Sequence, residues 1–271
     1  MPELPEVETT RRGIAPHIEG KRIATICVRN PNLRWPVPTD ELASLMRCRL
    51  QSVSRRGKYL LLATSKGTII IHLGMSGSLR IARSDEPPRL HDHVDLVLSD
   101  GTMLRFHDPR RFGCWLFTDQ DPNDHELIAH LGPEPLSDAF NLDYLYETSR
   151  GRKVAVKQFI MSSQVVVGVG NIYANEALYQ AGIHPKRAAG RIARQRYEKL
   201  LLAIKAVLAN AIEQGGTTLR DFVGGDGNPG YFKQSLNVYG RGALPCKQCE
   251  NPLTEIRMGQ RTTVFCKFCQ T

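Results

Sequence analysis

The sequence lacks any apolar run long enough to cross a membrane. No segment approaches the roughly 18 consecutive apolar residues that a spanning helix needs. The opening segment, MPELPEVETTRR, carries acidic side chains where a secretion signal would be apolar. Internal repeats and low-complexity tracts are also missing. The sequence therefore predicts a cytoplasmic protein with no membrane partner, and a monomer is the simplest expectation.

Acidic residues are too few to balance the basic ones. The chain has 36 Lys and Arg against 27 Asp and Glu, which gives a net charge of +9 and an isoelectric point near 9.3. This excess disfavours acidic partners and favours a polyanion such as nucleic acid. Three of the seven cysteines, Cys27, Cys48 and Cys114, are scattered singly and are interpreted as ordinary reduced thiols. No organic cofactor is expected.

The other four cysteines form two closely spaced pairs near the C-terminus. Each pair is separated by two residues, and sixteen residues lie between the pairs. This spacing is typical of a tetrahedral four-thiolate zinc site, with two strands expected between the pairs, over residues 253–258 and 262–265. Four thiolates leave no open coordination position, so one structural Zn²⁺ is expected. The predicted ligands are Cys246, Cys249, Cys266 and Cys269.

The N-terminal half contains short apolar and alternating runs, which are typical of antiparallel strands. A helix is expected before them over residues 6–18, with Glu6 and Glu8 in its first turn, where the helix dipole favours negative charge. Strands are expected over residues 23–28, 60–64, 68–73, 94–98 and 103–106. The pattern favours an antiparallel β-sandwich with flanking helices.

The C-terminal half favours helices over residues 154–161, 172–180 and 197–214, the second of them opened by Asn171 as its N-cap. Residues 132–150 have weak periodicity and are interpreted as a linker. The expected fold class is therefore an α+β multidomain protein. Its predicted parts are a β-sandwich domain (1–131), a linker (132–150), a helical domain (151–242) and a β-hairpin zinc finger (243–271).

Five motifs occur in order along the chain and together resemble the formamidopyrimidine-DNA glycosylase family over nearly its whole length. They are PELPEVET (2–9), HLGMSG (72–77), DPRRFG (108–113), GVGNIYANEAL (168–178) and the four-cysteine finger. The resemblance implies a bifunctional glycosylase and AP lyase of base excision repair, acting on double-stranded DNA. Its implied substrates are 8-oxoguanine, formamidopyrimidines and abasic sites. It also implies that the helical domain is a helix-two-turn-helix DNA-binding domain with a lesion lid.

Pro2 is the predicted nucleophile. If Met1 is removed, Pro2 exposes a secondary amine, and an α-amino group has a pKa near 8, against about 10.4 for lysine, so more of it is neutral at pH 7. Attack on the sugar C1′ gives an iminium ion that acidifies the C2′ proton, so base loss leads to β- and then δ-elimination. Taken alone, Pro2 and Pro5 are better interpreted as residues that stiffen a helix entry. The resemblance favours the catalytic role.

Three further residues receive catalytic roles from the resemblance. Glu3 is the implied general acid and base at the ribose ring oxygen and the leaving base. Glu6 is the implied supporting residue, although a plain helix-start charge is nearly as good an interpretation. Lys58 is implied to reach the lesion and its phosphate, while a solvated hairpin lysine is the alternative.

The damaged nucleotide must leave the helix to reach Pro2, and the gap must be filled. The resemblance implies that Met75 replaces the everted base, Phe112 wedges beside it and Arg110 hydrogen-bonds the orphaned cytosine. Without the resemblance, Met75 and Phe112 would be taken as core residues and Arg110 as a turn cation.

The resemblance also implies contacts to DNA phosphates. Asn171 and the backbone N–H groups of residues 168–171 can bind a phosphate at a helix start. His91, Lys157 and Arg261 are implied to add contacts that carry no sequence preference.

Two further features concern flexible or variable positions. The glycine-rich segment 217–231 is expected to be mobile and, by resemblance, to be the lid over an everted 8-oxoguanine. Ser162 stands where the family often has Asp, which puts a local turn contact in doubt.

Two alternative functions remain at this point. An endonuclease VIII-like enzyme would share the fold and the proline nucleophile but prefer oxidised pyrimidines. A zinc protein that only binds damaged DNA would keep the basic charge and the finger without the chemistry. Leu4, Met75 and the long glycine-rich segment favour the purine enzyme.

Overall fold

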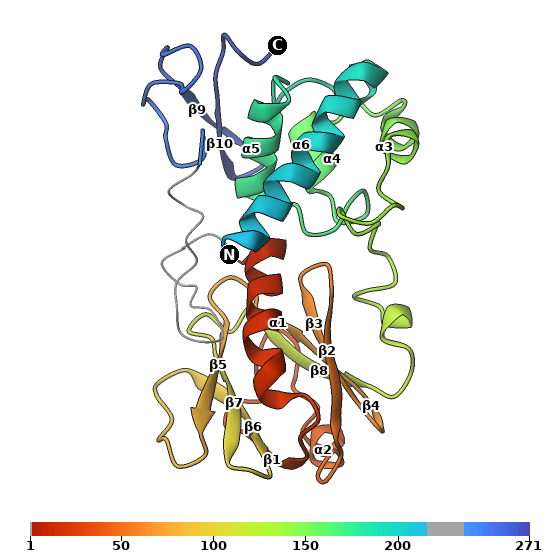
Figure 1. Cartoon of the computed structure of the whole chain (residues 1–271), viewed down its shortest axis with the longest axis vertical. Helices are drawn as coiled ribbons and strands as arrows, with labels where there is room; N and C mark the ends of the chain where they lie inside the picture. Colours follow the sequence, from red (N-terminus) through yellow and green to blue (C-terminus); the bar gives the residue numbers. More distant parts are fainter. Residues whose placement is uncertain (1, 216–235) are drawn as a thin grey trace. The chain divides into compact units, whose positions relative to one another are not determined.

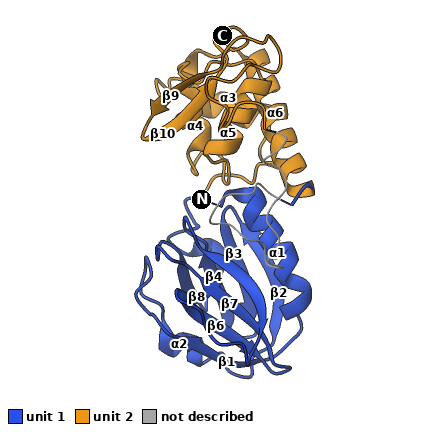
Figure 2. Cartoon of the chain, turned by 90° about the vertical axis from the view of Figure 1, so that its left-hand side faces the viewer, with its two compact units in different colours: residues 1–130, 214–231 blue, residues 131–213, 232–271 orange. Residues whose placement is uncertain are grey.

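The structure is a computed structural model and describes residues 2–215 and 236–271. Its chain divides into two compact units, coloured separately in Figure 2. Residues up to His130 belong to unit 1, and Leu131–Glu213 together with the C-terminal residues belong to unit 2. Among the described residues, no helix is long and apolar enough to span a membrane. The predicted lid, residues 217–231, lies outside the described residues.

Unit 1 is a sandwich of two four-stranded antiparallel sheets, with helix α1 (Leu4–Ile18) beside them (Figure 1). This arrangement confirms the predicted β-sandwich. The first sheet has the order β1 (Ile23–Val28), β6 (Asp92–Leu98), β7 (Thr102–His107) and β5 (Ser78–Arg83). The second has the order β2 (Leu50–Arg56), β3 (Tyr59–Thr64), β4 (Gly67–His72) and β8 (Cys114–Thr118). A short helix α2 (Thr39–Ala43) and a 3-10 turn (Pro122–Asp124) also belong to the described part of this unit.

The topology brings several loops to one end of the sandwich. The loop 73–77 joins β4 of one sheet to β5 of the other, and the loop 108–113 makes a second crossing from β7 to β8. His72 lies opposite both Tyr59 and Cys114 in the second sheet, while His107 lies opposite both Ser78 and Asp92 in the first. The two crossings, the β2–β3 turn and the start of β6 therefore meet at the same end.

The core between the sheets comes from the alternating apolar positions that the sequence shows. Leu60, Leu62, Ile69 and Ile71 of the second sheet are fully buried, as is Leu96 of the first. Removing such side chains from water is the main favourable contribution to folding, about 1.5–3 kcal/mol for each one. The two sheets thus support the loops that meet at one end of the sandwich.

The described residues of unit 2 form four helices and a hairpin. They are α3 (Leu142–Ser149), α4 (Val156–Met161), α5 (Asn171–Gln180), α6 (Arg194–Glu213), and the strands β9 (Thr254–Met258) and β10 (Arg261–Phe265); a 3-10 turn spans Ala189–Arg191. The hairpin β9–β10 follows the predicted finger strands to within one residue at each end. Together with unit 1, these elements confirm the α+β class.

The segment 132–150 is not the bare linker that the sequence suggested. It contains α3, whose N-cap is Asn141, and the hydroxyl of Tyr144 donates to the backbone oxygen of Val165 at 2.9 Å. Phe140 and Leu145 are fully buried. Pro133 and Pro135 favoured a linker for this segment. The helix is only two turns long and has few apolar residues, so its periodicity is weak.

Candidate active site and zinc centre

The first residues of α1 form a buried and tightly bonded start. Pro2 is buried, and Glu3 is the N-cap of the helix, which begins at Leu4, two residues before the predicted start. Glu3 and Glu6 form a capping box, in which the Glu6 carboxylate accepts the Glu3 backbone N–H at 2.8 Å. Both carboxylates are almost completely buried. Glu6 therefore lies in the first helical turn, where the helix-start interpretation put it, and its bond to the Glu3 N–H fixes the backbone next to Pro2.

Glu8 ties this helix to the turn that carries Lys58. Its carboxylate accepts from the Arg55 guanidinium at 3.2 Å and also pairs with Arg11 and Arg12. Burial alone raises the pKa of Glu8, but the bonds from Arg11 and Arg12 outweigh it and lower the pKa to about 2. Arg55 also donates to the backbone oxygen of Gly57 at 2.7 Å. The turn between β2 and β3 thus lies at the end of the sandwich where α1 begins (Figure 1), and Lys58 on this turn is half-buried.

The loop that carries Met75 is anchored by His72. Burial lowers the pKa of His72 to about 4, with a further contribution from the nearby positive charges of Lys58 and Arg34. The ring is therefore neutral at pH 7, and its Nδ1 accepts the backbone N–H of Gly74 at 2.9 Å. Met75, which follows Gly74, is half-buried.

The loop 108–113 presents an apolar ring and a cation to solvent. The Phe112 side chain is 43 % exposed, which is unusual for a large apolar residue on a well-bonded loop. The exposed Arg110 guanidinium lies over this ring, 4.8 Å from its centroid. The residue-based interpretation of Phe112 as a core residue is wrong. An exposed ring beside a cation fits contact with a stacked and negatively charged partner.

His91 lies at the start of β6 and adopts a left-handed backbone with φ 72°. Such a φ is uncommon outside glycine and needs surrounding bonds to hold it. The centroid of the His91 ring lies 6.1 Å from that of His93 and 6.0 Å from that of His107. Side chains of the first sheet hold the loop that leads to His91.

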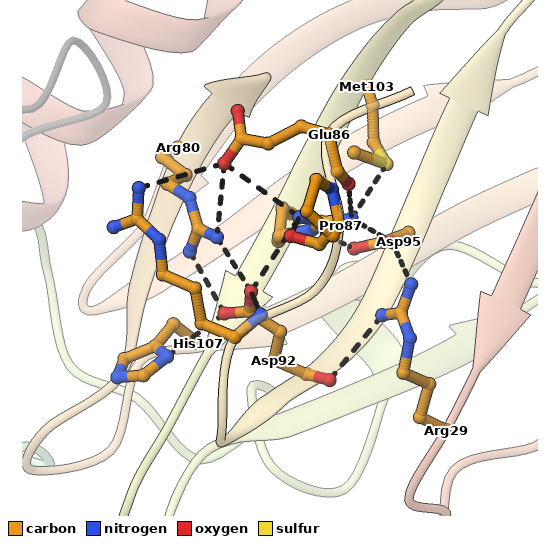
Figure 3. A network of polar contacts seen from close by, with 10 residues as sticks. Arg29, Arg80, Glu86, Pro87, Asp92, Asp95, Met103 and His107 are labelled. Carbon is orange, nitrogen blue, oxygen red and sulfur yellow. Dashed lines mark hydrogen bonds and ion pairs between the residues drawn. The ribbon is translucent and has the colours of Figure 1, made fainter. Parts of the chain in front are cut away.

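A buried ionic network supports the segment that leads to His91 (Figure 3). Arg105 pairs with Asp95 at 2.8 Å and donates to the backbone oxygens of Glu86 and Pro87 at 3.0 Å each. Arg29 completes the pairing with Asp95. Asp95 and Arg105 are cross-strand neighbours and form a buried ion pair. Arg105, held by this pair, supports the loop before His91 through its bonds to the backbone of Glu86 and Pro87.

Asp92 holds the same loop from its other side and should make folding acid-sensitive. Burial alone raises the pKa of Asp92, but bonds from Arg80, the Arg89 backbone and His107 outweigh it and lower the pKa to about 2. A folded-state pKa below the unfolded value contributes stability above pH 4, and this contribution is lost as the pH falls toward 2.

We expect Asp92→Asn to lower the free energy of unfolding at pH 7 by about 2 kcal/mol. Urea unfolding between pH 2.5 and 7 measures this loss and should show a weaker acid dependence in the variant. Asp100→Asn is the matched control, because the Asp100–Lys21 pair is at the surface and should contribute nothing measurable. Equal acid dependence of wild type and Asp92→Asn would contradict the assignment.

In unit 2, Asn171 is not the N-cap that the sequence suggested. Gly170 takes that position, and Asn171 is the first residue of α5. Its side chain accepts from the Lys157 ammonium at 2.7 Å and donates to the backbone oxygen of Thr262 at 3.0 Å. Lys157 also donates to Thr262 and Thr263, and it is 1 % exposed. The buried ammonium therefore joins α4, α5 and the finger, and a direct phosphate contact by Lys157 stays a prediction.

The turn after α4 closes although this chain has Ser162 where the family often has Asp. The backbone oxygen of Ser162 accepts the N–H groups of Val165 and Val166 at 3.0 and 3.1 Å. In the described part of the chain, the N–H groups of Gly168, Val169 and Gly170 have no backbone acceptor. These N–H groups precede a helix start and fit the predicted anion contact.

Unit 2 contains a basic cleft that was not predicted from the sequence. It is lined by Gly151, Arg152, Lys153, Ala188, Gly190 and Arg191. The signal that could have found it is the run Arg150-Gly151-Arg152-Lys153 just before α4, because clustered cations indicate a polyanion surface. Its three cationic side chains are exposed to solvent.

The four predicted cysteine ligands converge. Their sulfurs lie within 4.8 Å of one another, with Cys249 to Cys266 at 3.4 Å and Cys246 to Cys269 at 3.9 Å. Tetrahedral coordination with Zn–S bonds of about 2.3 Å requires sulfurs about 3.8 Å apart. A disulfide would need about 2.05 Å. The set therefore fits one closed structural zinc site.

Side chains around the sulfurs orient the site. The Tyr179 hydroxyl of α5 lies 3.1 Å from the Cys246 sulfur, and the Asn251 amide lies 3.5 Å from the Cys249 sulfur. Asn175 of α5 accepts the backbone N–H of Val264 at 2.9 Å. Hydrogen bonds to ligating sulfurs hold a metal site in its geometry. The finger and α5 therefore form one bonded assembly.

Three protein-family profiles match the chain. The formamidopyrimidine-DNA glycosylase N-terminal domain matches residues 1–115, the formamidopyrimidine-DNA glycosylase H2TH domain matches residues 131–223, and the zinc finger found in FPG and IleRS matches residues 243–271. The formamidopyrimidine-DNA glycosylase of Teredinibacter turnerae is 62 % identical over 271 residues, with both chains fully covered.

Solved structures agree with this result. The MutM (Fpg) protein of Thermus thermophilus is 37 % identical, with a TM-score of 0.90 over 99 % of this chain and 98 % of that one. The Fpg of Lactococcus lactis in complex with DNA containing an abasic site is 33 % identical, with a TM-score of 0.91 and full coverage of both chains. Other similar complexes contain Fapy-dG derivatives, carbocyclic 8-oxo-G or an oxidised pyrimidine.

Proposed function

Because the chain belongs to the formamidopyrimidine-DNA glycosylase family, we propose that it excises oxidised purines from duplex DNA and then cleaves the strand at the abasic site. The observation that carries this proposal is the buried Pro2–Glu3 start of α1, locked by Glu6 at the loop-rich end of the sandwich. Relatives that match over their full length include complexes with Fapy-dG, 8-oxo-G and abasic DNA. Bacterial relatives and a DNA substrate also favour action in the bacterial cytoplasm.

The chemistry assigned to Pro2 proceeds through a covalent intermediate. The neutral imino nitrogen forms a bond to C1′ of the everted nucleotide, and the C1′–base bond breaks as the base leaves with a proton. The nitrogen loses its proton, the C1′–O4′ bond of the sugar ring breaks and O4′ takes up a proton, which leaves an open-chain iminium ion at C1′. This iminium ion acidifies the C2′ proton. Loss of that proton expels the 3′-oxygen, and a second elimination expels the 5′-oxygen. Water then releases the sugar fragment and regenerates the amine.

Glu3 is assigned the proton transfers because it directly follows the nucleophile and is buried. Burial strengthens its interactions with a developing charge at the ribose ring oxygen. Glu6 supports it by holding the Glu3 backbone N–H. Lys58 is assigned to the lesion and its phosphate because it lies on the turn that Arg55 and Glu8 tie to α1.

The DNA contacts are assigned to the loops of the sandwich end and to basic or anion-binding groups of unit 2. Met75, Arg110 and Phe112 are assigned to the gap left by the everted nucleotide, since apolar wedges hold kinked DNA open. His91, Arg261 and the amides before α5 are assigned to phosphates, together with the basic cleft at Arg152 and Lys153. The sandwich domain (1–131) would thus carry the chemistry, and the helix-two-turn-helix domain (151–242) and the finger (243–271) would hold the duplex.

Strand cleavage on matched duplexes tests the proposal. Labelled duplexes carrying 8-oxoguanine, an abasic site, thymine glycol or no lesion are incubated with the zinc-loaded protein. We expect cleavage of the first two, with both the 3′- and 5′-oxygens of the lesion sugar expelled. Faster cleavage at thymine glycol than at 8-oxoguanine would favour the oxidised-pyrimidine enzyme. The observation behind this alternative is the complex of a relative with DNA containing an oxidised pyrimidine. A mobility shift without cleavage would leave only the binding protein.

A further inference from the structure

One fully buried carboxylate joins the loops 73–77 and 108–113, which lie at the loop-rich end of the sandwich. The Oδ1 atom of Asp108 accepts the Ser76 hydroxyl at 2.7 Å and the Arg110 backbone N–H at 3.3 Å, and its Oδ2 atom accepts the Gly113 N–H at 2.8 Å. Asp108 is 0 % exposed and Ser76 only 3 % exposed. A single side chain therefore bonds the loop 73–77 to both ends of the segment 110–113.

The backbone of Asp108 extends the connection to His91. Its N–H donates to the His91 oxygen at 3.0 Å, and its own oxygen lies 2.8 Å from Nε2 of His93. These bonds help to hold the left-handed backbone of His91. Asp108 thus contacts every loop of unit 1 to which a DNA contact was assigned, except the turn at Lys58.

The two loops also approach closely through glycines. A Cβ atom at Gly74 would lie 2.4 Å from the backbone carbon of Phe112, so any side chain there would push the loops apart. A Cβ atom at Gly113 would lie 2.7 Å from the backbone oxygen of His72. The backbones of the two loops are therefore in direct contact, with no side chain between them that could adjust.

In the loop 108–113, buried residues flank exposed ones: Asp108 and Gly113 are buried, while Arg110 and Phe112 between them lie at the surface. Ser76 of the other loop is also buried. Polar groups that are buried and fully bonded fix a geometry, because breaking one bond leaves another group without a partner. Such a support suits side chains that must enter the stack of a kinked duplex without first being ordered.

We propose that Asp108 is a positioning residue for lesion recognition: its carboxylate holds Met75, Arg110 and Phe112 in one fixed arrangement, through which the base opposite the lesion is read. This inference rests on the proposed function, since it assigns a task to the loops only if the enzyme everts a nucleotide. Asp108 itself touches no reacting atom in this proposal.

The test is Asp108→Asn. An amide offers one acceptor oxygen and one NH₂ donor, so either the Gly113 N–H or the Arg110 N–H would face a donor. We expect the ratio of excision rates for 8-oxoguanine opposite cytosine and opposite adenine to fall about 10-fold or more, since small displacements at a reacting site have effects of this size. Ser76→Ala removes one donor of three and should give a smaller change in the same direction.

A matched control exists in unit 2. Glu176 is buried, and its carboxylate accepts three backbone N–H groups, from Asn237, Val238 and Tyr239. Glu176→Gln is therefore the same chemical change at a similar carboxylate remote in sequence from both loops. It should leave the cytosine-to-adenine ratio unchanged, even where it lowers the stability of the protein.

A second readout separates positioning from a structural role. Pyrrolocytosine opposite a tetrahydrofuran abasic analogue reports on the orphaned base by fluorescence and needs no turnover. We expect the wild type to change this fluorescence and Asp108→Asn to lose most of the change, while borohydride trapping at a natural abasic site stays within a few-fold.

The outcomes are distinct. An unchanged ratio and an unchanged fluorescence response in folded Asp108→Asn would overturn the inference, as would an equal loss of every activity. Absence of excision by the wild type would instead overturn the proposed function.

Discussion

Replacing Pro2 by glycine should reduce the borohydride-trapped adduct with 8-oxoguanine duplex by about 100-fold or more, the scale expected when an activated nucleophile is removed. The terminal imino nitrogen forms an iminium ion directly, and the pyrrolidine ring prevents free rotation about its N–Cα bond. A terminal glycine supplies only a primary amine on a freely rotating backbone. Denaturing gel electrophoresis after borohydride reduction measures the adduct.

Pro5→Ala is the matched control for this experiment. Pro2 lies just before the first turn of α1, and Pro5 lies within that turn. The Pro5 nitrogen belongs to a peptide bond, so it cannot act as a nucleophile. The control should keep trapping close to the wild-type level. Intact mass must show loss of Met1 in the active protein, because a retained methionine makes the Pro2 nitrogen an amide. Full trapping by Pro2→Gly, or activity of a protein that retains Met1, would exclude Pro2 as the nucleophile.

Glutamine variants of the two neighbouring carboxylates sharpen the same experiment. Glu3→Gln should lose base excision by about 100-fold or more, as when a general acid is removed, yet keep trapping at a preformed abasic site. Glu6→Gln keeps an acceptor for the Glu3 N–H, since glutamine also serves in a capping box. Glu6→Gln should therefore be mild and Glu6→Ala severe. A Glu6→Gln variant as inactive as Glu3→Gln would make Glu6 a proton relay instead.

Short-range patterns predicted the zinc centre and the β-sandwich class well. The Cys246 and Cys249 pair, repeated at Cys266 and Cys269, constrains the ligands by local spacing alone, and the sulfurs do converge. The strand β8, in contrast, was not among the expected strands, although Trp115 is fully buried. Its five residues are too short to show a period, and only pairing with β4 makes it a strand.

The strand β2 escaped for a different reason. Its sequence LQSVSRR has only two apolar residues, and the fully buried one, Leu50, lies at its start. The strand is stabilised by pairing with β3 and by the contact of Arg55 with Glu8 of α1. Such long-range contacts have no signature within a window of the sequence.

The site residues show the same limit. The sequence and the resemblance pointed to Arg110 and Phe112, but nothing local indicated that Asp108 bonds both loops, because Ser76 is 32 residues away. Likewise, Asn171 looked like an N-cap from its position before an apolar run. In the structure, a buried bond to Lys157 replaces that local role. Side chains whose partners lie across the fold are those that pattern reasoning misassigns.

The second large effect should come from the zinc site. Cys249→Ser should abolish stoichiometric zinc binding and weaken binding to duplex DNA by about 10- to 100-fold or more, as changes around metal ligands commonly do. The loss should exceed that of one phosphate contact, because the finger also carries Thr262 and Thr263, which hold Lys157 and through it Asn171. Zinc content by mass spectrometry and fluorescence anisotropy with a tetrahydrofuran duplex measure both effects.

Two further variants make the zinc experiment specific. Cys27→Ser alters an exposed lone thiol of unit 1 and should change neither zinc content nor affinity. Tyr179→Phe removes only the hydroxyl near the Cys246 sulfur, so it should keep one zinc but release it faster to a chelator. At DNA concentrations high enough to restore binding, Cys249→Ser should still be trapped by borohydride, since Pro2 and Glu3 belong to the other unit. Wild-type affinity in a zinc-free Cys249→Ser protein would show that the finger has no part in holding the duplex.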